Sequence, residues 1–335
     1  MNRQVVFFIP DRQQVSLFRD ADPDRDWRLF NTGVHVWIGQ TYLRLKQAGY
    51  PVALSDTVPE AGLVVAHADH VAELLRRRRW GAPLTVVAAR ADRPRQPYAD
   101  WEIVQNAAGA DANTVFHIQH WPQPGLVPRD AARGNRVRTV AFKGTVGEMA
   151  PELAAPEWAD ALARQGIEWR CDAVAWGGNA SSYQTSWNDY GETDLVVAMR
   201  RDLSHLHVKK PASKLINAWL AGVPAILGPE QAYRELRRSP LDYIEAASPA
   251  EAAAAIARLA ADPALYGAMV ENARLRSDEV RAQRCTQTWA TLLFETIPAR
   301  RAPLPVALVR LGWRSLRCRA RAWRTGGPTG QKRPQ

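Results

Sequence analysis

Short apolar runs alternate with helix-forming stretches along most of the chain, and this alternation constrains the fold more than any other feature. In the first half, the pattern predicts strands at 5–9, 52–54, 62–66, 84–88, 102–104 and 114–118 and helices at 34–48 and 71–79. Strands that alternate with helices in this way are typical of a parallel sheet covered by helices. We therefore predict an α/β fold.

The rhythm breaks at residues 120–130, where three prolines and Gly125 exclude a helix and favour an extended connector. Beyond it, the pattern predicts strands at 138–142, 167–170, 194–198, 223–227 and 243–246, and helices at 156–165, 213–221, 231–237 and 249–261, with helical sequence on to about 296. A chain of 335 residues is too long for one ordinary core. We predict an N-terminal domain at 1–125, a second domain at 131–298 and a tail at 299–335.

The segment 209–228 is the most informative part of the second domain, because it predicts a loop, a helix, a tight turn and a buried strand. We predict Ser213 as the N-cap of the helix and Gly222 as the left-handed residue after it. A helix N-terminus favours anions, and Lys210 and Lys214 beside it predict a pyrophosphate site. Asn217 lies one turn further on, where its amide can hydrogen-bond a ribose hydroxyl. A helix, turn and strand used for packing alone is the alternative.

Two further loops are expected at the same edge of the sheet. Lys143 and Gly144 end the first strand of the second domain, and Arg200 and Arg201 follow the strand at 193–199. Ligands of open α/β sheets bind beyond the carboxyl ends of the strands. Gly144 would let the backbone approach a phosphate, with Lys143 or Thr145 adding contacts, and an arginine would pair with it. A plain turn and a solvated charged loop are the alternatives.

The segment 209–228 resembles the donor motif of the GT-B glycosyltransferases, those related to family-1-like transferases, and the resemblance extends over about 137–296. The matching residues are Pro211, Lys214, Leu215, Ala218, Gly222 and Pro224. Asn217 departs from the pattern, because the family commonly has a glutamate there that holds the ribose. The resemblance implies two Rossmann-like domains, the second of which binds a nucleotide sugar.

The resemblance also implies a reaction: transfer of the sugar to a glycan, a lipid-linked molecule or a small molecule bound by the first domain. The donor-binding residues would be Lys143, Gly144, Arg200, Lys210, Ser213, Lys214 and Asn217. The resemblance further implies a reaction without a bound metal, because GT-B enzymes generally work without one. His205 and His207 lack a third ligand nearby, so we predict no metal site and no cofactor besides the nucleotide-sugar co-substrate.

A catalytic base is expected in the first domain, where GT-B enzymes commonly place a glycine-containing turn. Asn31 to His35 form such a turn at the start of a predicted helix, and His35 has a side chain suited to general-base work. An inverting enzyme needs a base of this kind, whereas a retaining enzyme can lack one. A structural role for His35 is the alternative, and the other candidates are Asp11, His117 and His120.

The basic charge of the protein lies in its tail. The ten arginine and lysine residues from Arg300 onward equal the whole formal net charge of +10. Residues 303–324 predict a basic amphipathic helix with tryptophans on its apolar side, which is typical of peripheral binding to anionic membranes. The alternatives are a helix packed on the body and a solvated tail. Nucleic-acid binding is not expected, because the tail matches no fold for that purpose.

We predict a cytoplasmic protein. No apolar run reaches the roughly 18 residues of a membrane span, no export signal is recognisable, and three cysteines without a C-x-x-C pair indicate reduced thiols. Two other functions stay open beside the transferase: a sugar-nucleotide epimerase of the same architecture, and a non-catalytic nucleotide-sugar-binding protein anchored by its tail.

Overall fold

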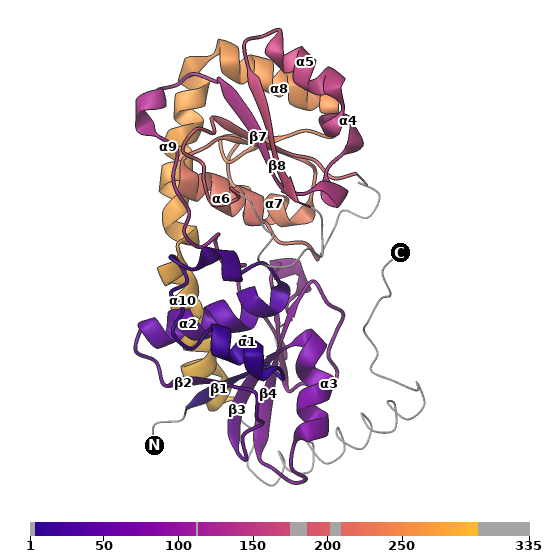
Figure 1. Cartoon of the computed structure of the whole chain (residues 1–335), viewed down its shortest axis with the longest axis vertical. Coiled ribbons are helices and arrows are strands. Elements are labelled where there is room, and N and C mark those ends of the chain that lie inside the picture. Colours follow the sequence, from indigo (N-terminus) through magenta and orange to yellow (C-terminus); the bar gives the residue numbers. More distant parts are fainter. Residues whose placement is uncertain (1–3, 112, 175–185, 202–208, 301–335) are drawn as a thin grey trace. The chain divides into compact units, whose positions relative to one another are not determined.

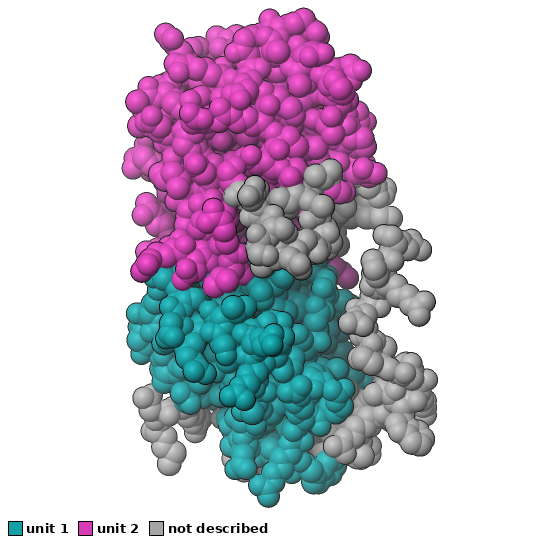
Figure 2. Space-filling view, viewed as in Figure 1, with its two compact units in different colours: residues 1–23, 30–119, 285–335 teal, residues 24–29, 120–284 magenta. Residues whose placement is uncertain are grey.

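The computed structural model describes residues 4–111, 113–174, 186–201 and 209–300, which form two compact units (Figure 1). The first unit holds the described residues of 1–23, 30–119 and 285–335, and the second holds those of 24–29 and 120–284 (Figure 2). Each unit contains one sheet, and the paired strands of both sheets are parallel. The expected α/β architecture with two Rossmann-like units is confirmed.

The sheet of the first unit has six strands in the order β2-β1-β3-β4-β5-β6. The strands are β1 (Val5–Phe8), β2 (Val52–Ser55), β3 (Gly62–His67), β4 (Leu84–Ala91), β5 (Trp101–Val104) and β6 (Val115–His117). Strands β3 and β4 are apolar over most of their length and buried on both faces, as expected where helices cover both sides of a parallel sheet. The carboxyl ends of β1 and β3 therefore lie side by side.

The helices of the first unit are α1 (Arg12–Leu17), a π-helical turn (His35–Gln40) that continues into α2 (Thr41–Gln47), and α3 (Ala68–Arg77), with a 3-10 turn at Ala107–Gly109. The expected helix at 34–48 is thus present, with a π-helical first part. Helix α1 was not predicted; the Asp11 carboxylate caps it by accepting from the N–H groups of Gln13 at 2.7 Å and Gln14 at 3.3 Å.

The sheet of the second unit has five strands in the order β11-β10-β9-β7-β8. They are β7 (Thr139–Thr145), β8 (Glu168–Val174), β9 (Leu195–Ala198), β10 (Ala225–Leu227) and β11 (Ile244–Glu245). The helices are α4 (Pro151–Ala154), α5 (Pro156–Ala163), α6 (Ser213–Ala221), α7 (Gln231–Leu236), α8 (Pro249–Ala261) and α9 (Pro263–Val280), with 3-10 turns at Trp27–Leu29, Ala131–Arg133 and Val146–Glu148. The core between them includes Phe142, Trp219 and Tyr243.

A buried carboxylate fixes the start of this second sheet. Asp194, which is 0% exposed, accepts hydrogen bonds from Nε of Arg129 at 2.9 Å and Nε of Arg133 at 2.8 Å. It also accepts from the backbone N–H groups of Arg138 at 2.9 Å and Thr139 at 3.0 Å. Asp194 directly precedes β9, Arg138 directly precedes β7 and Thr139 starts it, so this one group aligns two neighbouring strands.

Two segments lie differently from the expected division at 125 and 131. After α9, the chain forms α10 (Ala282–Ala290), a π-helical turn (Thr291–Thr296) and α11 (Ile297–Ala299). From Cys285 it belongs to the first unit, because Trp289 packs against the rings of Phe7 and Trp37 at centroid distances of 6.5 and 6.1 Å. Conversely, Asp24 binds the N–H of Gly125 at 3.1 Å, so residues 24–29 belong to the second unit.

The predicted tail helix at 303–324, together with His205 and His207, lies outside the described residues. Among the helices of the described ranges, none has both the length and the apolar character needed to cross a bilayer.

Candidate functional site

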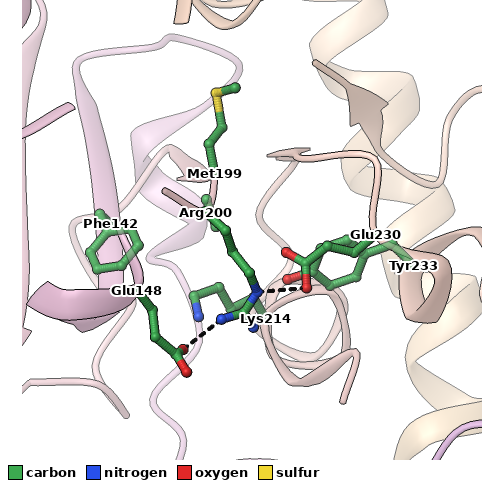
Figure 3. Close-up of a pocket in the computed structure, with 8 residues that line it drawn as sticks. Phe142, Glu148, Met199, Arg200, Lys214, Glu230 and Tyr233 are labelled. Carbon is green, nitrogen blue, oxygen red and sulfur yellow. Dashed lines mark hydrogen bonds and ion pairs between the residues drawn. The ribbon is translucent and has the colours of Figure 1, made fainter. Parts of the chain in front are cut away.

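A narrow pocket lies at the carboxyl edge of the second sheet. It is bounded by the ends of β7 and β9, the first turn of α6 and the start of α7 (Figure 3). The residues that line it are Phe142, Glu148, Ala198, Met199, Arg200, Lys214, Glu230 and Tyr233. This is the edge at which the sequence placed a ligand, and two of its predicted residues, Arg200 and Lys214, line the pocket together.

Helix α6 begins at the pocket with an open first turn. Its bounds agree with the prediction, but its cap does not: Ser213 is the first helical residue and Ala212 is the cap, whose carbonyl accepts from the N–H of Ile216 at 3.0 Å. No side chain of the described residues caps this end, and an open helix N-terminus of this kind can bind an anion. Gly222 ends the helix in the left-handed conformation, with φ 67°, as predicted.

Lys214 and Gly144 meet at this turn, although 70 positions separate them in the sequence. A Cβ atom added to Gly144 would lie 3.2 Å from Nζ of Lys214 and 3.0 Å from the ring of Phe142. The amine also lies 5.5 Å from the centre of the Phe142 ring, within the range of a cation–π interaction. Glycine at 144 therefore leaves the space in which the half-buried lysine rests.

Arg200 lies between two carboxylates. Its Nε donates to Glu230 at 2.8 Å, and its Nη1 lies 2.8 Å from one carboxylate oxygen of Glu148 (Figure 3). The other oxygen of Glu148 lies 3.0 Å from Nζ of Lys210. Two cations and two carboxylates thus line one pocket, and a third cation, Lys210, pairs with one of those carboxylates.

The charges of this cluster change each other's ionisation. Burial alone would raise the pKa of Glu148, but Arg200, Lys210 and Lys214 lower it to about 2. Burial, reinforced by the charge of Arg200, lowers the pKa of Lys214 to about 8. Lys214 is therefore a cation held in a partly desolvated place near another cation. An incoming anion would relieve that strain, which is the chemistry of an anion-binding site.

Lys143 and Asn217 have other partners. Side chains alternate along a strand, so Lys143 points away from Gly144's side of β7; its Nζ binds Asp172 at 2.6 Å and the carbonyl of Ser186 at 3.1 Å. The Asn217 oxygen accepts from the backbone N–H of Gln123 at 2.9 Å. Neither residue lines the pocket, and of the predicted donor-binding residues only Arg200 and Lys214 do. The role of the others in donor binding stays a prediction.

In the first unit, His35 starts the π-helical turn, as the sequence indicated. Its N–H donates to Oγ1 of Thr32 at 3.2 Å, which makes Thr32 the local cap. The imidazole is half-buried and meets the ring of Phe18 edge-on, at a centroid distance of 5.1 Å. This packing gives His35 a structural contact in addition to the catalytic role that the sequence suggested.

A second histidine, which the sequence analysis missed, has the geometry of a base. His67 ends β3 and is 2% exposed; its Nδ1 accepts from the backbone N–H of Asp69 at 3.3 Å and lies 3.3 Å from a carboxylate oxygen of the same residue. Arg93 holds that carboxylate with two hydrogen bonds of 2.8 and 2.9 Å. Among the described residues, Nε2 of His67 has no hydrogen-bond partner. A Cβ at Gly33 would lie 3.0 Å from that nitrogen, so glycine leaves room beside it.

His70 completes this group. Its ring centre lies 6.4 Å from that of His67, and burial, together with the charge of His67, lowers the pKa of His70 to about 4. His70 is therefore neutral near pH 7. The sequence signal was available in Ala66-His67-Ala68-Asp69-His70 at the end of a predicted strand, the edge where ligands bind.

The Gly144 contact generates a prediction about anion binding. Gly144→Ala places a methyl group against Lys214 and Phe142, and we expect the affinity for inorganic pyrophosphate to fall about tenfold, because relief of such overpacking moves the amine. Gly147→Ala is the matched control, since a Cβ there has no atom of the described residues within 4 Å. Isothermal titration calorimetry measures both. Equal affinities in the two variants would contradict the assignment of Gly144.

Comparisons with known proteins bear on the fold. No family model matches the chain, and no curated protein matches it in sequence. Among solved structures, sucrose-phosphate synthase from Thermosynechococcus elongatus is similar with a TM-score of 0.58 and 12% identity, over 89% of this chain and 100% of that one. TarM of S. aureus is similar with a TM-score of 0.51 and 10% identity, over 76% of this chain and 58% of that one.

The TM-scores show that this chain shares the fold of those structures, whereas sequence identities this low do not show which reaction it performs. Both comparisons cover most of this chain. The described protein has the GT-B glycosyltransferase fold.

Proposed function

We propose that this protein is a glycosyltransferase that binds the diphosphate of a nucleotide sugar at Lys214, Arg200 and Lys210. The observation that carries the proposal is the convergence of these three cations beside Gly144 and the open first turn of α6, in a GT-B fold. A nucleoside diphosphate leaves with negative charge, and cations arranged in advance stabilise that charge as the bond to the sugar breaks.

The proposed donor site needs no metal for charge neutralisation, because the lysines and the arginine supply it. We infer a metal-independent reaction with the nucleotide sugar as co-substrate. Ser213 would contribute its backbone N–H from the first turn of α6. In this proposal Lys143 and Asn217 act indirectly: Lys143 holds the loop at Ser186, and Asn217 holds the connector at Gln123. The ribose would then be bound by a group other than Asn217.

Lys214→Ala tests the donor site. We expect the affinity for the recognised nucleoside diphosphate, found by a panel of UDP, GDP, ADP and CMP, to fall at least about tenfold, because a charged hydrogen-bond donor is lost. Transferase turnover should fall with it. Lys209→Ala is the matched control, since that lysine is exposed and does not line the pocket. Undiminished binding by Lys214→Ala would refute the site.

Measured over a range of pH, the same binding should weaken at high pH. Because the pKa of Lys214 is lowered to about 8 in the free protein, a diphosphate binds a protonated amine below that pH and must recruit a proton above it. The contribution of Lys214 to the affinity is therefore fully present below about pH 7 and is lost as the pH rises through 8. Lys214→Arg should remove this fall, because a guanidinium stays charged.

For the acceptor, we propose that the first unit supplies the base and that His67 is that base. In this proposal Nδ1 of His67 carries a proton directed at the Asp69 carboxylate in place of accepting from the Asp69 N–H, and Nε2, which has no partner among the described residues, takes the proton of an acceptor hydroxyl. The acceptor oxygen then bonds to the anomeric carbon of the sugar, and the bond from that carbon to the diphosphate breaks. The diphosphate keeps the electron pair of that bond, which balances the step. Inversion at the anomeric carbon follows.

His67→Gln and His35→Gln decide between the two candidate bases. We expect His67→Gln to lower kcat about 100-fold or more, the usual contribution of a general base, with donor affinity unchanged. His35→Gln should leave kcat within about twofold, since its ring packs on Phe18. The reverse order would return the role to His35. If both variants keep their activity, a transferase without a protein base is favoured.

A non-catalytic nucleotide-sugar-binding protein is the second candidate function. The observation that favours it is the diversion of the Asn217 side chain to Gln123, which removes the group expected at the ribose. Activity measurements distinguish the two candidate functions. A binding protein would bind a diphosphate in a Lys214-dependent way but would transfer no sugar to any acceptor, and His67→Gln would have no effect on it.

We also propose that the protein acts in the cytoplasm, peripheral to an anionic membrane, through the basic segment 303–324; a glycan or lipid-linked acceptor would suit that place. Its support is the sequence pattern, in which arginines and an apolar stripe with Trp313 and Trp323 follow helical spacing on adjoining faces. Full-length protein should float with vesicles that contain phosphatidylglycerol, and a 1–300 truncation should not. The full-length protein should dissociate from the vesicles as the salt concentration rises, because salt screens the attraction between its arginines and the anionic lipids. Equal flotation of the two forms would refute the proposal.

A further inference from the structure

Glu148 occupies the position in which a bound anion would sit in the donor pocket. Each of its carboxylate oxygens faces one cation: Arg200 Nη1 at 2.8 Å and Lys210 Nζ at 3.0 Å. Lys214, the third cation, adds to the lowering of the Glu148 pKa. A carboxylate that bridges an arginine and a lysine in this way has the same contacts as a phosphate group would have.

The backbone holds Glu148 in this place. The residue ends the 3-10 turn that follows β7, and its neighbour Met149 forms an antiparallel bridge with Arg200. The N–H of Ala150 donates to the carbonyl of Met199 at 2.8 Å. These backbone contacts pair the segment that follows Glu148 with the end of β9. They therefore hold the Glu148 carboxylate beside the Arg200 guanidinium.

The two carboxylates at Arg200 differ in accessibility. The Glu230 side chain is 2% exposed and its partner atom is the inner Nε of Arg200, whereas the Glu148 side chain is 33% exposed and faces the outer Nη1. Removal of a charge from a buried pair is strongly unfavourable, so Glu230 is a permanent partner. Glu148 can turn into water and keep its charge solvated, so Glu148 is the exchangeable one.

We propose that Glu148 is a resident anion that a ligand must displace, and that this exchange makes the pocket selective for ligands with two or more negative charges. A monoanion that replaces Glu148 restores only the charge that it removes, so it gains nothing. A diphosphate brings more negative charge to Arg200, Lys210 and Lys214 than the carboxylate it displaces. Glu148 would thus exclude the abundant monoanionic carboxylates and admit the diphosphate of a nucleotide sugar.

This inference rests on the proposed donor site, and its test uses inorganic pyrophosphate so that the two can fail separately. Glu148→Gln keeps the shape of the side chain and removes its charge. Glu152→Gln is the matched control, because Glu152 is an exposed carboxylate four residues away in the first turn of α4. Calorimetry at pH 7 and low salt measures the binding of pyrophosphate and of acetate to wild type and both variants, after thermal unfolding has shown that each is folded.

We expect Glu148→Gln to bind pyrophosphate about three- to tenfold more tightly than wild type, the effect of one lost competing ion pair. Acetate should compete with pyrophosphate in Glu148→Gln and fail to compete in wild type and in Glu152→Gln. Equal or weaker pyrophosphate binding by Glu148→Gln, or no competition by acetate, would overturn the role of Glu148. Wild-type binding of pyrophosphate without binding of any nucleotide sugar would leave Glu148 in its role and refute the transferase.

Discussion

The arrangement of the second unit depends on one buried carboxylate. Asp194 has no exposed surface, and a charge in that position is stable only when its hydrogen bonds are made. The donors come from the connector, through Arg129 and Arg133, and from the first residues of β7. These segments must therefore assemble together. Because β7 and β9 are parallel, alignment at their starts also sets the relative positions of their carboxyl ends.

That alignment explains how a small cluster of charged side chains comes together at the carboxyl edge of the sheet. Gly144 is the next-to-last residue of β7, and Arg200 follows β9. Lys214 lies in the first turn of α6, the helix that connects β9 to β10. Each side chain is contributed by a different segment, and the sheet supplies the common reference. Binding residues at loop ends on a rigid scaffold combine precision with freedom to vary. The likeness to GT-B structures at low identity agrees with this separation of scaffold and site.

Most of the scaffold could be predicted from the sequence because its signals are local. Helix α6 has the predicted bounds because an apolar face ends at Gly222, which adopts a left-handed conformation. The convergence of Lys214, Gly144 and Arg200 followed from the rule that ligands bind at the carboxyl ends of parallel strands. The orientation of Lys143 was also within reach, since neighbouring residues of a strand face opposite sides and Gly144 faces Lys214.

Other features depend on partners distant in sequence. Nothing in the residues around Asn217 indicates that its amide binds Gln123, and nothing near Glu148 indicates Arg200 and Lys210. The return of Cys285 onward to the first unit depends on Trp289 finding Phe7 and Trp37. The Asp69–His67 pair was missed for a different reason: the turn before His35 resembled a family feature more closely than a histidine at a strand end.

The desolvated amine of Lys214 has a consequence for reactivity. A lysine whose pKa is about 8 is unprotonated in roughly one molecule in ten at pH 7, whereas an ordinary lysine is unprotonated in fewer than about one in a thousand. The free amine is the nucleophilic form. The pocket thus contains a side chain that is selectively reactive toward aldehydes and activated esters, and an occupying phosphate would shield it, so acylation of this single amine can report whether the pocket is filled.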